Sequence, residues 1–89
     1  MVITYMDFQD MSPAEQAEAV WTSGTFFGER REQGLWIQCY SLVGFYVEVF
    51  YDDRENRLLR FEAFTQLALL RPYLLLHLNQ AGVTDPDVQ

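Results

Sequence analysis

The chain has 89 residues, of which 49% are hydrophobic and 16% aromatic, so its composition indicates one small folded domain rather than a disordered segment. Its formal net charge is −7, and all of its basic residues are arginines. Binding to nucleic acids or membrane surfaces depends on basic side chains, so we expect neither partner. The absence of lysine also excludes Schiff-base catalysis and a Walker-type phosphate site.

The single cysteine, Cys39, rules out an internal disulfide or a cysteine metal cluster. The first residues, MVITYMDFQD, lack the basic and then apolar pattern of a signal peptide. The most apolar run, Leu67 to Leu78, is too short to span a bilayer. We therefore expect one cytoplasmic domain over residues 1–89, with 1–11 as an N-terminal extension and 84–89 as a frayed tail.

A helix start is encoded by the stretch SPAE at residues 12–15. Its serine can accept a hydrogen bond from an early amide, its proline pre-sets φ, and its glutamate can reach back to the serine. The residues that then recur at helical spacing are Ala14, Ala17, Val20 and Trp21, and Gly24 is a natural stop. The pattern predicts a helix over residues 13–22.

Between residues 25 and 64 the apolar pattern has a period of two, which is typical of β-strands. Three turn signals end in Gly or Asn, which tolerate the left-handed conformation that closes a three-residue hairpin loop. These signals are Glu32-Gln33-Gly34, Leu42-Val43-Gly44 and Arg54-Glu55-Asn56. The spacing predicts an antiparallel meander with strands at 25–31, 35–41, 45–53 and 57–64.

Three-residue loops would pair residue 31 with 35, 41 with 45, and 53 with 57. This register places most apolar side chains on one face of the sheet, and a shift of one residue would distribute them over both faces. The side chains expected to form the core are Phe27, Leu35, Ile37, Cys39, Val47, Val49, Tyr51, Leu59, Phe61 and Ala63.

The segment TQLALLRPYLLLHLNQAGV predicts a C-terminal helix whose buried stripe consists of Leu67, Leu70, Leu74, Leu78 and Ala81. Because Pro72 lacks a backbone donor, either the helix kinks there or a short first turn gives way to a helix that starts there. The predicted fold class is α+β. It is a four-stranded antiparallel meander sheet with an N-terminal and a C-terminal helix packed on one face, in the order α-β-β-β-β-α.

The same register fills the second sheet face with two aromatic rows that flank one polar row. The rows are Arg30–Trp36–Phe50–Arg60, Gly28–Gln38–Glu48–Glu62 and Phe26–Tyr40–Tyr46–Phe64. An open apolar patch of this kind is uncommon on a monomer. We therefore expect a homodimer that forms through this face, through the C-terminal helix, or through both. Leu69 and Leu76 lie off the main helical stripe and also need cover.

Three alternatives for this face stay open. It could bind another protein. It could bind a small aromatic or anionic ligand between Trp36, Tyr40, Tyr46 and Phe50, with charges from Arg30 and Arg60. Finally, the rings could lie flat on a half-exposed sheet, with the two arginines stacked over Trp36 and Phe50.

No catalytic motif stands out. Glu48 and Glu62 are cross-strand neighbours in this register, and they could share a proton or be two solvated carboxylates steadied by arginines. The second interpretation is favoured, because the spacing comes from a register and not from a motif. Cys39 is expected as a small buried hydrophobe and His77 as a structural residue near a helix end. The sequence thus predicts a non-enzymatic protein with no cofactor and no metal.

The segments GTFF at residues 24–27 and GFYVEVFYD at residues 44–52, preceded by a helix ending in Val20-Trp21, resemble a family of short uncharacterised bacterial proteins. The likeness extends roughly from Ser12 to the last helix. It implies a bacterial source and one small α+β domain, and it implies neither an activity nor functional residues.

Overall fold

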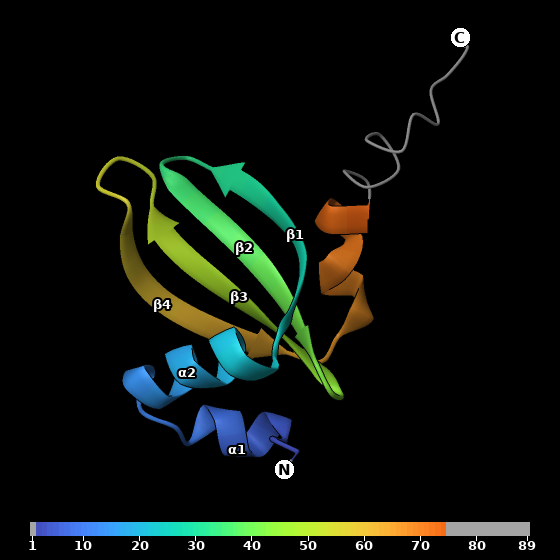
Figure 1. Ribbon diagram of the computed structural model, residues 1–89. Helices are drawn as coiled ribbons and strands as arrows, with labels where there is room; N and C mark the ends of the chain where they lie inside the picture. The colour runs from blue at the N-terminus through green and yellow to red at the C-terminus, as the bar shows by residue number, and fades with distance from the viewer. Residues whose placement is uncertain (1, 75–89) are drawn as a thin grey trace, which may run out of the picture.

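The structure is a computed structural model that describes residues 2–74. Its elements are α1 (Tyr5–Gln9), α2 (Pro13–Ser23), β1 (Thr25–Glu32), β2 (Leu35–Leu42), β3 (Phe45–Asp52), β4 (Arg57–Phe64) and the 3₁₀ helix η1 (Leu67–Leu70). The strands form one antiparallel sheet in the order β1-β2-β3-β4 (Figure 1). The predicted α+β class is therefore confirmed, with helical segments before and after a four-stranded meander.

Both N-terminal helices begin with a capping box, in which the side chains of the N-cap residue and of the third helical residue accept hydrogen bonds from each other's backbone amides. The Ser12 hydroxyl accepts from the Glu15 amide at 3.2 Å, and the Glu15 carboxylate accepts from the Ser12 amide at 2.9 Å. Thr4 and Asp7 make the equivalent pair at the start of α1. The prediction for α2 is confirmed, whereas residues 1–11, expected only as an extension, contain α1 and its fully buried Phe8. A helix of five residues is too short to show a periodic pattern.

Between β3 and β4 the central pairs agree with the prediction, since Glu48 lies opposite Glu62 and Phe50 opposite Arg60. At the hairpin end, a register shift between Phe50 and Tyr51 places Asp52 opposite Arg57, which departs from the prediction of a pair between residues 53 and 57. The first two hairpins also differ from the predicted register. Their loops have two residues each, so that Glu32 pairs with Leu35 and Leu42 pairs with Phe45. In the first loop Gln33 and Gly34 have φ of 33° and 85°, as a type I′ turn requires.

The shorter loops move β2 by one residue and so turn its side chains to the opposite faces of the sheet. Tyr40 lies opposite Val47, while Cys39 lies opposite Glu48. The predicted core set is therefore wrong for β2: Leu35, Ile37 and Cys39 do not share a face with Val47 and Val49. It is also wrong for Leu59, which is the extra residue at the register shift of β4 and is exposed. Both alternating sets of LWIQCYSL contain apolar residues, so the pattern of the strand could not decide between the two registers.

The sheet has a buried cluster on each face. We call the first the α2 face, because α1 and α2 cover it (Figure 1). Its buried residues are Phe8, Ala19, Val20, Leu42, Phe45, Val47 and Val49. We call the second the Tyr73 face, where Leu70 and Tyr73 of the C-terminal segment pack with Cys39 and Phe64. The C-terminal segment therefore lies on the face opposite α2, and not on the same face as predicted.

The buried side chains of the C-terminal segment differ from the predicted stripe. Leu70 is buried as predicted, but Leu67 and Leu74, assigned to the same stripe, are exposed. Leu70 and Tyr73, three residues apart, reach the same buried cluster on the sheet. Tyr73 consequently occupies the buried position that the α-helical pattern gives to Leu74.

Residues 71–74 are helical and follow η1, so a short first turn precedes the helix near Pro72. Leu69 is exposed, in line with its expected place off the stripe. No helix within residues 2–74 is long and apolar enough to cross a bilayer. The predictions that lie outside the described residues concern Leu76, His77, Leu78, Ala81 and the tail 84–89.

Candidate functional site

The Tyr73 face carries a polar cluster in which three side chains hold one another. Glu48 Oε2 accepts hydrogen bonds from the Tyr73 hydroxyl at 2.5 Å and from Arg30 Nη2 at 3.1 Å. Arg30 Nε in turn donates to the Tyr73 hydroxyl at 3.2 Å. Because Tyr73 is fully buried, these bonds satisfy a hydroxyl that water does not reach.

A glycine lets the ring of Tyr73 lie against the sheet. Gly28 sits on β1 opposite Cys39, next to a bulge in the strand. A Cβ at Gly28 would lie 3.1 Å from Tyr73 Cδ1 and 3.4 Å from its Cβ, so a side chain there would crowd the ring and require it to shift. We call the four sheet residues that receive Tyr73 the tyrosine socket: Gly28, Arg30, Cys39 and Glu48.

The environment of the socket keeps the Cys39 thiol and the Tyr73 phenol protonated. Burial, and next the Glu48 carboxylate, raise the pKa of the Cys39 thiol to about 12. Burial, followed by the hydrogen bond to Glu48, also raises the pKa of Tyr73. A thiol is a nucleophile only as the thiolate, so Cys39 is not poised for catalysis. The arrangement is suited to holding the C-terminal segment on the sheet.

Glu48 and Glu62 are cross-strand neighbours, as the sequence predicts. Each has its own arginine, since Arg30 binds Glu48 and Arg60 Nε donates to Glu62 Oε2 at 2.6 Å. The Arg60 guanidinium also lies 4.0 Å from the ring centre of Phe50. The structure thus agrees with two carboxylates steadied by arginines, although the Glu48 side chain is only 12% exposed.

The α2 face carries a row of aromatic rings that reaches the surface. Trp21 packs edge-to-face on Tyr40, with ring centres 5.7 Å apart, and on Phe61 at 6.3 Å. Phe26 also packs edge-to-face with Tyr40, with ring centres 5.7 Å apart. Trp21 is 50% exposed and Phe26 is 52% exposed. We call these four residues the aromatic strip; it contains no charged side chain.

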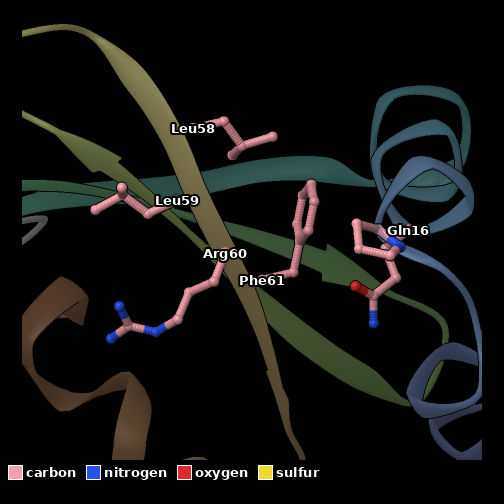
Figure 2. A pocket seen from close by; sticks show the side chains of 6 residues that line it. Gln16, Leu58, Leu59, Arg60 and Phe61 are labelled. Atoms are coloured by element: carbon pink, nitrogen blue, oxygen red, sulfur yellow. The ribbon is translucent and has the colours of Figure 1, made fainter.

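Next to Phe61 the surface is hollowed into a groove of about 270 Å³ between β4 and the start of α2 (Figure 2). Its lining residues are Pro13, Gln16, Leu58, Leu59, Arg60 and Phe61. Leu58 is also exposed, so the groove extends the apolar surface of the strip along the outer edge of the sheet.

The residues predicted as one interface or ligand face are divided between the two faces of the sheet. Trp36 and Tyr40 lie on the α2 face, opposite Tyr51 and Val47. The others lie on the Tyr73 face: Arg30, Tyr46, Glu48, Phe50, Arg60 and Glu62. The predicted aromatic rows are therefore absent, because they depended on the wrong register of β2.

The expected stacking of arginines on rings is present with one change. Arg60 covers Phe50 as predicted, whereas Arg31, and not Arg30, lies over Trp36 at 5.2 Å. The Trp36 indole N–H donates to Glu29 at 2.9 Å. Arg30 is instead committed to the tyrosine socket.

Sequence reasoning missed the central role of Tyr73 and the exposure of Trp21. A signal for the first was present: a glycine inside a strand often marks a bulge or the close approach of another group, and Gly28 does both. Trp21 was assigned to the buried pattern of its helix, and nothing in that pattern shows that half of the ring stays open.

Within residues 2–74 no three His, Cys, Asp or Glu side chains are grouped so that they could hold a metal ion. In comparisons with known proteins, no family model, curated protein or solved structure matches the chain. The resemblance to short bacterial proteins stays a prediction.

Proposed function

We propose that the protein is a non-enzymatic interaction module of the bacterial cytoplasm that associates with a second copy of itself through the aromatic strip. The observation that carries this proposal is the half-exposure of Trp21 and Phe26, which are in continuous ring contact with Tyr40 and Phe61. Aromatic rings favour edge-to-face contact with further rings. A second copy would supply them across a two-fold axis, where each strip meets itself.

The edges of the sheet are less suited to association than its α2 face. A register shift in β1 leaves Phe27 as an extra residue, and one in β4 leaves Leu59. Bulges of this kind twist an edge strand away from pairing with another chain. The exposed part of β4 also carries Arg57, Arg60 and Glu62. Contact through a face therefore fits these strands better than the addition of a strand at an edge.

The net charge allows the two candidate partners, a second copy and a basic protein, to be distinguished by the salt dependence of binding. Each copy carries a formal charge of −7, so two copies repel each other at low salt. Screening at physiological ionic strength limits this repulsion to about 8 Å, while burial of the uncharged strip is little affected. Self-association should therefore strengthen as salt rises, whereas binding of a basic partner would weaken.

The oligomeric state tests the proposal. We expect the wild type to be a dimer by light scattering at tens of micromolar, and Phe26→Glu to be a folded monomer because it places a charge in the strip. Val43→Glu is the matched control, since Val43 is an exposed apolar residue in the β2–β3 turn, outside the strip. This control should stay dimeric. A wild type that is monomeric at every salt concentration would refute self-association.

A second candidate function, binding of a small aromatic or anionic ligand, is supported by the groove beside Phe61. Its volume of about 270 Å³ is near the lower end of ligand pockets, and its lining is mainly apolar, because the Arg60 guanidinium is turned to the Tyr73 face and lies over Phe50. Anilinonaphthalene sulfonate, which is aromatic and anionic, is a suitable probe. We expect its fluorescence on the protein to be lost in Leu58→Glu and kept in Val43→Glu; equal fluorescence in both would argue against this site.

A further inference from the structure

We propose that the tyrosine socket accepts Tyr73 from a second copy of the chain as well as from its own, so that two copies exchange their C-terminal segments. This inference rests on the proposed self-association, but it concerns a different contact. The occupant is defined by the structure itself, because the socket already holds the segment that we expect it to receive from a partner.

The C-terminal segment is attached to the sheet by few side chains. Between residues 65 and 74 only Leu70 and Tyr73 are buried, while Leu67 and Leu69 face solvent. A segment with so few buried apolar contacts opens at a much lower free energy than the whole domain unfolds. Opening would uncover Cys39 and Phe64, which share a buried cluster with these two side chains.

An exchanged segment would make the contacts that it makes within one chain. The Tyr73 hydroxyl would again donate to Glu48 and accept from Arg30, and the ring would again lie on Gly28. Only the link between β4 and η1 has to change, and this link consists of the exposed residues Thr65 and Gln66. Exchange of an identical element is a low-cost route to a dimer, and a short connection favours it.

Two complementary full-length variants test the exchange. The blocked-socket variant, Gly28→Val with Cys39→Ala, keeps Tyr73 but crowds its place on its own sheet, since a Cβ at Gly28 already lies 3.1 Å from Tyr73 Cδ1. The empty-socket variant, Tyr73→Ala, keeps an intact socket and the only thiol of the mixture. In the mixture, the first chain can donate its segment to the second. The readout is the rate at which iodoacetamide labels Cys39 of the empty-socket variant.

When the blocked-socket variant is present at about ten times the dissociation constant, labelling of the empty-socket variant should slow about tenfold, because the occupied socket shields the thiol. The matched control donor carries Tyr73→Ala in addition and should give no slowing. Equal labelling rates with the two donors would overturn the proposal. Circular dichroism checks that each variant is folded; if Tyr73→Ala is not, Tyr73→Leu replaces it in the same experiment.

The outcome is distinguishable from failure of the proposed function. Both donors carry the wild-type aromatic strip, so any protection through the strip is the same for both and cancels in the comparison. A dimer that Phe26→Glu disrupts, together with equal labelling rates, would leave the strip as the interface and remove the exchange. If only the donor with Tyr73 slows the labelling of Cys39, and Phe26→Glu stays dimeric, the exchange would stand and the strip would be removed as the interface.

Discussion

Replacing Tyr73 by Phe removes one hydroxyl from the tyrosine socket and leaves the ring in place. The hydroxyl donates to Glu48 at 2.5 Å and accepts from Arg30 at 3.2 Å. A hydrogen bond to a charged group contributes about 1.5–3 kcal/mol. Glu48 keeps its bond to the guanidinium and is 12% exposed, so water can replace part of the loss. We therefore expect Tyr73→Phe to weaken docking of the segment by about 1.5–2 kcal/mol.

The labelling rate of Cys39 measures this loss locally. Cys39 is fully buried with Tyr73, so modification at neutral pH requires the segment to open. A loss of 1.5–2 kcal/mol should raise the rate roughly 10–30-fold, because each 1.4 kcal/mol changes the open population about tenfold. Urea unfolding followed by circular dichroism reports separately on the stability of the sheet.

Tyr46→Phe is the matched control, since Tyr46 lies on the same face and its ring stacks on Phe64 at 5.6 Å. Its hydroxyl makes no hydrogen bond to any of the residues 2–74 that the structure describes. We expect this variant to label at nearly the wild-type rate. Equal rates for Tyr73→Phe and wild type, or equal acceleration in both variants, would show that the hydroxyl does not hold the segment.

Three further changes test other parts of the fold. Val47→Asp should unfold the domain, because it buries an unpaired charge between Tyr40 and Ala63; a cooperative thermal transition near that of the wild type would contradict this. Ser12→Ala should cost about 1 kcal/mol in urea unfolding through loss of the α2 cap. Stability should fall as pH rises above 9, because Cys39, with its folded pKa of about 12, keeps a proton that the unfolded chain loses. Cys39→Ala should reduce this dependence between pH 9 and 10, while Tyr73, whose pKa burial also raises, contributes the remainder; an unchanged slope there would refute the assignment.

The positions of the main elements could be predicted because their signals are local. Helix α2 was expected over residues 13–22 and spans Pro13–Ser23, since its capping box and its stop lie within the same short stretch. Strand β3 was expected over residues 45–53 and spans Phe45–Asp52. The pairing of Glu48 with Glu62 was also predicted, although the loop has four residues rather than three, because the register shift between Phe50 and Tyr51 offsets the extra residue.

The orientation of β2 could not be predicted from such signals. A glycine at the end of a turn fits both a two-residue and a three-residue loop, and the two choices differ by one residue of register. The sets Leu35, Ile37, Cys39 and Trp36, Gln38, Tyr40 both contain apolar side chains, so either one could face either core. What distinguishes them is the contact of Cys39 with Tyr73, which joins residues far apart in the sequence.

Glu48 is the one charged residue within the apolar run of β3, and the socket gives a physical reason for its position. Its carboxylate is the common acceptor for the Tyr73 hydroxyl and the Arg30 guanidinium. An apolar side chain there would leave both donors without this partner on a largely buried surface, which is costly. An apolar Tyr73 face without the carboxylate could accept many hydrophobic segments. With it, the face favours a segment whose phenol lies three residues after a buried leucine, so the residue that breaks the strand pattern also selects what covers it.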